Sequence, residues 1–150
     1  MGAKHGVPGE GPLDADVMLV GQNPGAEEDE TGRPFVGRAG KYLTGVLAEY
    51  GIKREDLYIT NIVKHASPKN RKPYSDEIAA CLPYLETQIS LINPKIIVLL
   101  GAAAKQTPHV TGIEYFEVIH PSAAMRFPKF KEKFRLQIAE LSKQIAQIEF

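Results

Sequence analysis

DVMLVGQNPGAEEDETGRPFVG, residues 16–37, joins a short apolar run to a long polar segment. Residues 16–21 are rich in aliphatic and β-branched side chains, which is typical of a buried strand. After Gly21 the stretch has two prolines, three more glycines and four carboxylates, a composition that predicts a loop. Loops held by a rigid scaffold often carry function, so this one is the first candidate for a binding site.

The rest of the chain alternates short apolar runs with longer amphipathic ones. We expect strands at 16–21, 57–64, 95–101 and 115–120, and helices near 38–50, 75–92, 102–106 and 129–148. Ser75 is the expected N-cap of the second helix. This alternation predicts right-handed βαβ crossovers and a four-stranded parallel sheet covered on both faces. The fold class is therefore α/β, with residues 1–150 forming one domain.

The composition limits the classes of function. Lys and Arg together number 18, as do Asp and Glu, so the chain as a whole is not basic and a polyanion would have to meet a local patch. The single cysteine, Cys81, cannot form an intramolecular disulfide, and no apolar signal peptide is visible. These features predict a cytoplasmic protein. The longest apolar run, residues 95–104, is too short to span a bilayer, so we expect no membrane contact.

Polar residues gather where the predicted strands end. GQNPG follows the first strand, Asn61 lies near the end of the second, and HPSAAMR begins at His120 after the fourth. Each has an alternative structural role, since Asn23 and Pro24 suit a turn, Asn61 could cap a strand and His120 could be a core residue. Parallel strands bind ligands at their carboxyl ends, so the three together predict a site there.

A phosphate-binding loop is a weaker interpretation. Helix N-termini bind anions, and GRAGKY at 37–42 could receive the phosphate of a larger ligand. However, Gly-Lys-Ser/Thr does not follow the first strand, and GQNPG does not match the dinucleotide fingerprint.

Five motifs in order resemble the uracil-DNA glycosylase superfamily, most closely its family 4 branch. They are GQNPGAEED, GRPFVGRAG, YITNIVKH, NRKP and HPSAAMR, and the resemblance extends from about Gly9 to Phe134. It implies a three-layer α/β/α sandwich with a four-stranded parallel sheet, in agreement with the pattern of strands and helices. It also implies a monofunctional enzyme that hydrolyses the N-glycosidic bond of uracil in DNA and leaves an abasic site.

The resemblance assigns roles to individual residues. Phe35 corresponds to a ring on which the extruded base stacks, Asn61 to the amide that reads uracil, and Gln22 to a further pocket residue. His120 corresponds to the donor that stabilises negative charge on O2 of the leaving base. The residues implied in DNA contact are Arg38, Ser122, Ala124, Met125 and Arg126.

Asn23 departs from the family 4 pattern, which typically has Ala in GEAPG. The family 1 branch has an Asp there, which can orient water and stabilise a cationic sugar. An amide can orient water but cannot accept its proton. GQNPG is closer to GINPG of the mismatch-specific branch, so we expect a slower, mainly dissociative reaction in which Asn23 positions water. Glu28 and Asp29 are further candidates to assist, although acidic loops are commonly just solvated.

The family 4 resemblance also implies an iron–sulfur cluster on four cysteines, which this sequence does not match. Two of these cysteines belong to an N-terminal extension that the chain lacks, and His65 stands at the third position. One thiolate, Cys81, cannot hold a four-iron cluster. A zinc site shared by His5, His65 and Cys81 lacks a local spacing motif. We therefore expect no metal and no cofactor, with Cys81 packed as a small apolar residue.

Basic segments at 64–73 and 125–135 suit contact with DNA phosphates, or equally a solvated loop and an amphipathic helix. The predicted function is uracil-DNA glycosylase, acting as a monomer on DNA. The alternatives are a mismatch or deaminated-purine glycosylase, and a non-catalytic nucleic-acid-binding relative that lost the reaction together with its Asp.

Overall fold

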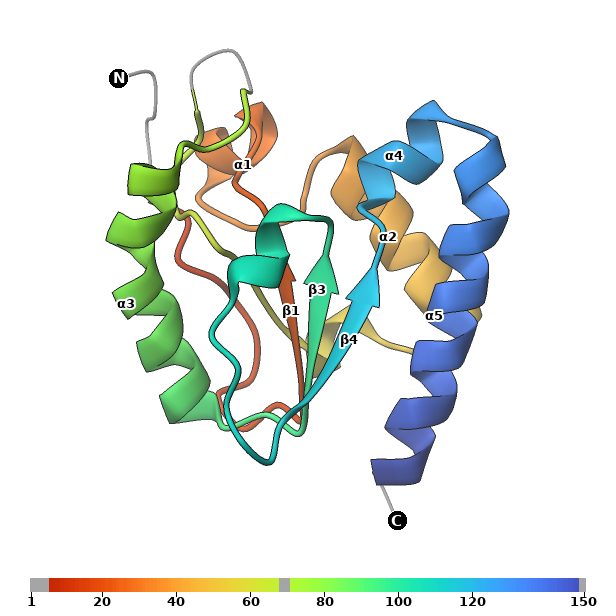
Figure 1. The fold of residues 1–150 in the computed structure, drawn as a ribbon. Helices are drawn as coiled ribbons and strands as arrows, with labels where there is room; N and C mark the ends of the chain where they lie inside the picture. The colour runs from red at the N-terminus through yellow and green to blue at the C-terminus, as the bar shows by residue number, and fades with distance from the viewer. Residues whose placement is uncertain (1–5, 68–70, 149–150) are drawn as a thin grey trace.

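The computed structural model describes residues 6–67 and 71–148. Strands and helices alternate along the chain, as the sequence predicts (Figure 1). The elements are β1 (Val17–Gly21), α1 (Ala26–Thr31), α2 (Arg38–Glu49), the 3₁₀ helix η1 (Arg54–Asp56), β2 (Tyr58–Asn61), α3 (Ser75–Ile92), β3 (Ile96–Leu100), the 3₁₀ helix η3 (Ala103–Gln106), β4 (Glu114–Val118), α4 (Pro121–Arg126) and α5 (Lys129–Ile148).

The four strands form one sheet in the order β2-β1-β3-β4, with every neighbouring pair parallel. The chain leaves β1 toward β2 and then returns past β1 to form β3, so the direction of winding reverses between β1 and β3. In such sheets the crevice outside the carboxyl ends of the strands at this reversal is where ligands bind. The α/β fold class is confirmed.

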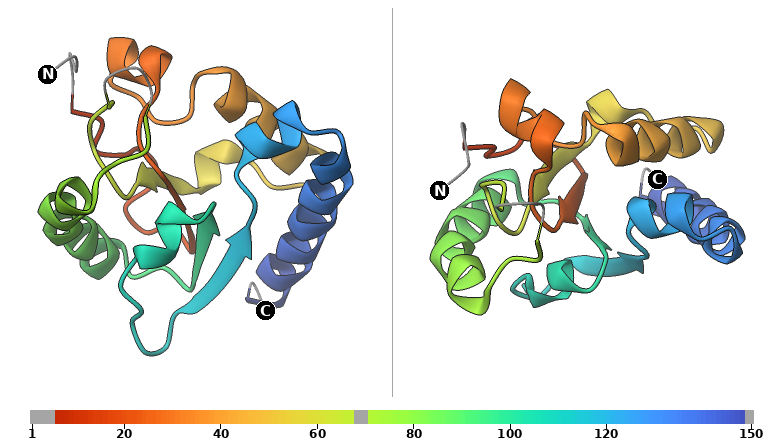
Figure 2. Two further views of the ribbon diagram at one scale, coloured as in Figure 1. Left: turned by 45° about the horizontal axis from the view of Figure 1, so that its top comes forward. Right: turned by 90° about the horizontal axis from the view of Figure 1, so that it is seen from above.

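Helices cover both faces of the sheet (Figures 1 and 2). Val17 and Leu19 of β1 point into a core that α2, α4 and α5 complete, while Met18 and Val20 point into a second core shared with α3 and η3. This alternation is the period-two pattern of a strand buried on both faces. The result is the expected three-layer sandwich.

Several local expectations need correction. The expected strand at 57–64 ends at Asn61, and the short helix at 102–106 is the 3₁₀ helix η3. The N-cap of α3 is Tyr74 and not Ser75, because the Glu77 carboxylate accepts a hydrogen bond from the Tyr74 amide at 2.7 Å. The polar loop after β1 contains the short helix α1, and α4 follows β4 directly.

Among the described residues, no helix combines the length and the apolar character that crossing a membrane requires.

Two glycines of α2 differ in what surrounds them. Gly40 is buried, and a Cβ built there would overlap the carbonyl group of Phe35. Gly45 is exposed, and a Cβ there would meet no atom within 4 Å. Close approach of α2 to Phe35 therefore requires Gly40, whereas Gly45 only weakens the helix.

We expect Gly40→Ala and Gly45→Ala to change stability in opposite directions. Gly45→Ala should raise the free energy of unfolding by about 0.5–1 kcal/mol, because alanine restricts the unfolded chain. Gly40→Ala should lower it by about 1–3 kcal/mol through overpacking. Urea unfolding of both variants measures the difference, and a Gly40→Ala protein as stable as Gly45→Ala would contradict this packing.

Candidate active site

The ends of three strands and the start of α2 enclose a cleft at the carboxyl edge of the sheet. Its volume is about 370 Å³. Many of the predicted site residues line this cleft, namely Gln22, Asn23, Phe35, Arg38, Asn61, His120 and Ser122. The sheet thus brings together segments that are up to 100 residues apart, from Gln22 to Ser122.

Phe35 has an unusual backbone conformation that turns its ring into the cleft. Its φ is 51°, in the left-handed region that residues with a Cβ rarely adopt. The ring lies against Gly21 at the end of β1, where any Cβ would overlap both the ring and the Asn61 amide. The ring centroids of Phe35 and His120 are 6.1 Å apart and their planes are tilted by 32°. Phe35 therefore forms one wall of the cleft and stands close to His120.

Asn61 offers an unpaired hydrogen-bond acceptor in the cleft. The residue is the last of β2 and only 2% of its surface is exposed. Its Oδ1 is one of two buried side-chain polar atoms that have no hydrogen-bond partner among the described residues, the other being Tyr42 Oη outside the cleft. An unpaired buried acceptor costs about 1–3 kcal/mol of stability, so a ligand N–H is a natural partner for it.

The hydrogen bonds of His120 assign its neutral tautomer. The backbone N–H of Ser122 donates to Nδ1 at 3.1 Å, and Ser122 Oγ lies 2.7 Å from the same nitrogen. Because Nδ1 accepts, the ring proton is on Nε2. Burial lowers the pKa of His120 below its ordinary value, which favours the neutral imidazole. Gly101 at the end of β3 packs beside this ring, since a Cβ there would lie 3.3 Å from His120 Cβ.

Asn23 is tied to the segment that follows β2. Its Nδ2 donates to Oγ of the buried Ser67 at 3.2 Å. This bond holds the side chain of Asn23 in one orientation where it lines the cleft.

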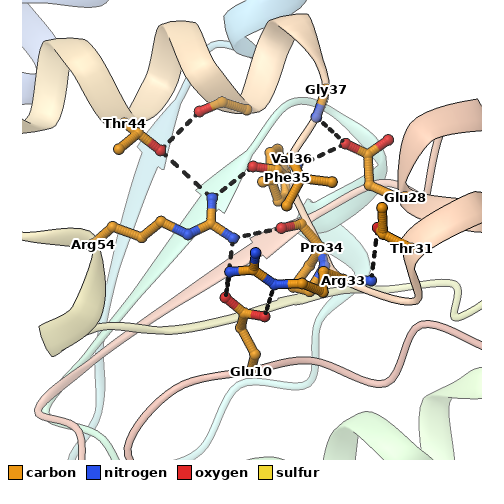
Figure 3. A network of polar contacts seen from close by, with 11 residues as sticks. Glu10, Glu28, Thr31, Arg33, Pro34, Phe35, Val36, Gly37, Thr44 and Arg54 are labelled. Atoms are coloured by element: carbon orange, nitrogen blue, oxygen red, sulfur yellow. Dashed lines mark hydrogen bonds and ion pairs between the residues drawn. The ribbon is translucent and has the colours of Figure 1, made fainter.

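Glu28 is buried and is not the solvated loop residue that an acidic run suggests. Its Oε1 accepts from the amide of Gly25 at 3.0 Å. Its Oε2 accepts from the amides of Val36 at 2.9 Å and Gly37 at 2.7 Å (Figure 3). Because Gly37 is the N-cap of α2, a carboxylate of the chain already lies at this helix end. The site suggested for a phosphate at 37–42 is thus partly taken by Glu28. Asp29 is also buried.

A buried lysine lies behind Asn61 and outside the cleft lining. Lys64 Nζ donates to the carbonyl of Asn61, to Thr60 Oγ1 at 2.7 Å and to Gln88 Oε1 at 2.8 Å. Burial lowers its pKa to about 8. These contacts fix the end of β2 and direct the amine away from the cleft.

The residues predicted to contact DNA differ in accessibility. Arg38, at the start of α2, and Ser122 are exposed and line the cleft. Arg126 is exposed and Met125 is half-buried, both on α4. Ala124 is fully buried in the core with α2 and α5, so its side chain packs α4 against that core. Residues 68–70 of the basic segment 64–73 lie outside the described residues.

The residues present do not fit the iron–sulfur cluster that family 4 resemblance implies. The described residues include no group of three or more His, Cys, Asp or Glu side chains that could hold a metal. Cys81 is a buried free thiol whose Sγ lies 3.5 Å from the Lys64 amide, while His65 is exposed and His5 lies outside the described residues. Hydrogen bonds instead tie residues 7 and 8 to β2 and the residues after it, from Val7 N to Lys64 O at 2.7 Å and from Thr60 Oγ1 to Pro8 O at 2.6 Å.

Sequence reasoning missed the residues that support the cleft from outside. Arg54 on η1 donates to the carbonyls of Pro34 and Phe35, and Ser67 supports Asn23. Their partners are 19 to 44 residues away in the chain, so no local spacing marks them.

Comparison with known proteins agrees with this geometry. The family model described as the uracil DNA glycosylase superfamily matches residues 8–142. A type-4 uracil-DNA glycosylase of Pyrobaculum aerophilum is 40% identical, over 91% of this chain and 81% of that protein, and one of Archaeoglobus fulgidus is 37% identical over 85% and 76%. A type-4 uracil-DNA glycosylase of Thermotoga maritima is 58% identical over 65% of this chain, which corresponds to 51% of that protein. Because this family model covers most of the chain, the chain belongs to the uracil DNA glycosylase superfamily.

Proposed function

We propose that the protein is a monofunctional DNA glycosylase that removes uracil from DNA by hydrolysis and leaves an abasic site. The observation that carries the proposal is the buried, unpaired Oδ1 of Asn61, a residue that lines the cleft together with Phe35 and His120. The sequence identity between the chain and three type-4 uracil-DNA glycosylases supports the same reaction.

The chemistry of a uracil base fits the groups that line the cleft. Its flat ring would stack on Phe35 once the nucleotide leaves the helix. Its N3–H would donate to Asn61 Oδ1, and its O4 would accept from Asn61 Nδ2. Cytosine presents the reverse pattern, with an acceptor at N3 and a donor at C4, so the same amide orientation would reject it.

His120 would stabilise the departing base. Cleavage of the glycosidic bond leaves negative charge on the uracil ring, shared by O2. The Nε2–H of a neutral imidazole can donate to that oxygen, and the donor helps most where the charge is largest, in the transition state. The Ser122 amide on Nδ1 keeps the ring in the tautomer that this role needs.

Asn23 would position the water that attacks the sugar carbon. Its side chain lines the cleft and is held by Ser67. An amide cannot neutralise the cationic sugar, so bond cleavage would run ahead of water attack and depend mainly on His120. Among the described residues no lysine lines the cleft, and the amine of Lys64 is directed elsewhere, which favours hydrolysis over a covalent intermediate with strand cleavage.

We also propose that the partner is DNA and that the protein acts in the cytoplasm. Residues 1–150 would act as one domain and as a monomer, with Arg38, Ser122, Met125 and Arg126 contacting the DNA backbone or the space left by the base. Exposed Arg38 and Arg126 are suited to phosphates. A cytoplasmic setting is supported by Cys81, a buried free thiol that a reducing compartment would keep reduced.

The experiment that tests the function uses oligonucleotides that carry one uracil, hypoxanthine or xanthine, followed by alkali to cleave abasic sites. We expect cleavage at uracil, and release of hypoxanthine or xanthine in its place would assign a deaminated-purine glycosylase. Binding of uracil DNA without base release would indicate a non-catalytic relative.

His120→Ala should lower the single-turnover excision rate by on the order of a hundredfold, the usual effect of losing one such donor, while DNA binding changes little. The exposed His109 provides the control, since His109→Ala should retain the wild-type rate. Because burial lowers the pKa of His120, the wild-type rate should stay level as pH falls to about 6.5 and decrease only below that. Equal rates for His120→Ala and wild type would remove this residue from the mechanism.

Asn61→Asp should weaken the preference for uracil over cytosine. A carboxylate cannot donate to O4 of uracil, and it offers an acceptor to the amino group of cytosine. Matched oligonucleotides with uracil or cytosine at one position measure the ratio of excision rates. An unchanged ratio would show that Asn61 is not the base reader.

Asn23→Asp should raise the single-turnover rate, most clearly at a pH above the pKa of the new carboxyl group. An ionised carboxylate would both orient the water and stabilise the cationic sugar. Asn23→Ala should reduce the rate only modestly, because His120 still assists departure of the base. A rate for Asn23→Asp at or below that of Asn23→Ala would contradict the role given to this position.

A further inference from the structure

We propose that Arg54 is a positioning residue that holds Phe35 in its left-handed conformation and so keeps the stacking ring in the cleft. This inference rests on the proposed function, because it takes the Phe35 ring to be the surface on which the base stacks. Arg54 itself is on η1 and does not line the cleft.

The guanidinium of Arg54 contacts the peptide groups on both sides of Phe35. Nη1 donates to the Phe35 carbonyl at 2.6 Å, and Nη2 donates to the Pro34 carbonyl (Figure 3). The relative orientation of these two carbonyls is set by φ and ψ of Phe35 alone, since the two peptide planes meet at its Cα. One planar group that binds both carbonyls therefore fixes the conformation of Phe35.

A carboxylate holds the same loop from the other side. Glu28 Oε2 accepts from the amides of Val36 and Gly37, so the peptide between Phe35 and Val36 is bound at its oxygen by Arg54 and at its nitrogen by Glu28. Glu10 completes the support, with Oε2 3.4 Å from Arg54 Nη2 and a two-point contact to Arg33. Arg33 shares this acidic partner, whereas the contacts to the Pro34 and Phe35 carbonyls come from Arg54.

The position of the Phe35 ring over Gly21 depends on the backbone conformation of Phe35, because only noncovalent contacts keep the ring there. A residue with a Cβ disfavours the left-handed region by on the order of tenfold relative to the right-handed one. Without the Arg54 contacts, most molecules would leave this conformation and the ring would leave the cleft. An enzyme whose binding-competent state is populated one part in ten shows an apparent affinity weakened about tenfold.

The test compares Arg54→Met, which removes every donor, with Arg54→Lys, which has one ammonium group and cannot form the two-carbonyl fork. Arg33→Met is the matched control, because it removes the neighbouring cation from Glu10 and leaves the carbonyls of Pro34 and Phe35 untouched. Thermal unfolding shows whether each variant is folded. If Arg54→Met does not fold, the comparison of Arg54→Lys with wild type tests the proposal.

Two measurements are made on each variant. The first is the intraresidue HN–Hα nuclear Overhauser effect of Phe35 in the free protein, which is strong when φ is positive. The second is the split between KM and kcat for uracil excision. Arg54→Met should weaken the Overhauser effect and raise KM about tenfold while kcat changes less than threefold; Arg54→Lys should lie between, and Arg33→Met should match wild type.

A wild-type Overhauser effect and KM in both Arg54 variants would overturn the proposal, as would equal losses in Arg33→Met. If the wild type excises no uracil, the proposed function fails, and the Overhauser effect alone still decides whether Arg54 holds Phe35.

Discussion

Contact between the Phe35 ring and the Cα of Gly21 sets the shape of the cleft. The ring can lie there only because residue 21 has no side chain and because Phe35 adopts a positive φ. Gly40 lets α2 begin directly against the Phe35 carbonyl, and Glu28 holds the amides that follow. A side chain at either glycine would push the Phe35 ring away from Asn61 and His120, so the whole site depends on this close packing.

The cleft is also preorganised in its polar groups, at some expense of stability. Asn61 Oδ1 is buried without a partner among the described residues, and Lys64 is a buried amine whose burial lowers its pKa. Lys64 donates to the Asn61 carbonyl, so this buried lysine fixes the backbone of Asn61 from outside the cleft. Active sites commonly retain such unfavourable groups because a substrate supplies the missing partner. His120 follows the same logic, since its backbone contacts specify the neutral tautomer before any base arrives.

The sheet could be predicted from the periodicity of the sequence. The meeting of the site residues could be predicted from the rule that parallel strands end at one edge of a sheet. Phe35, Asn61 and His120 meet in the cleft as their motifs predict. The helix α1 could not be predicted from AEEDET, which has no apolar period and is held by contacts from Glu28 to residues 36 and 37. Arg54 and Ser67 were missed for a similar reason, since their partners are distant in sequence and any polar loop contains such residues. The N-cap preference of Ser75 was overridden by Glu77, which accepts from the Tyr74 amide and is itself paired with Arg71.

The contact on which the proposed reaction depends most is that between Asn61 Oδ1 and the N3–H of uracil. This can be measured without catalysis by NMR titration of the protein with uracil and with 3-methyluracil, which has a methyl group in place of that hydrogen. Uracil should shift the signals of the Asn61 side-chain amide and of the His120 ring, and 3-methyluracil should bind at least about tenfold more weakly, because it leaves the acceptor unpaired and adds a methyl group against it. Equal affinities for the two bases, or shifts confined to residues outside the cleft, would contradict the account.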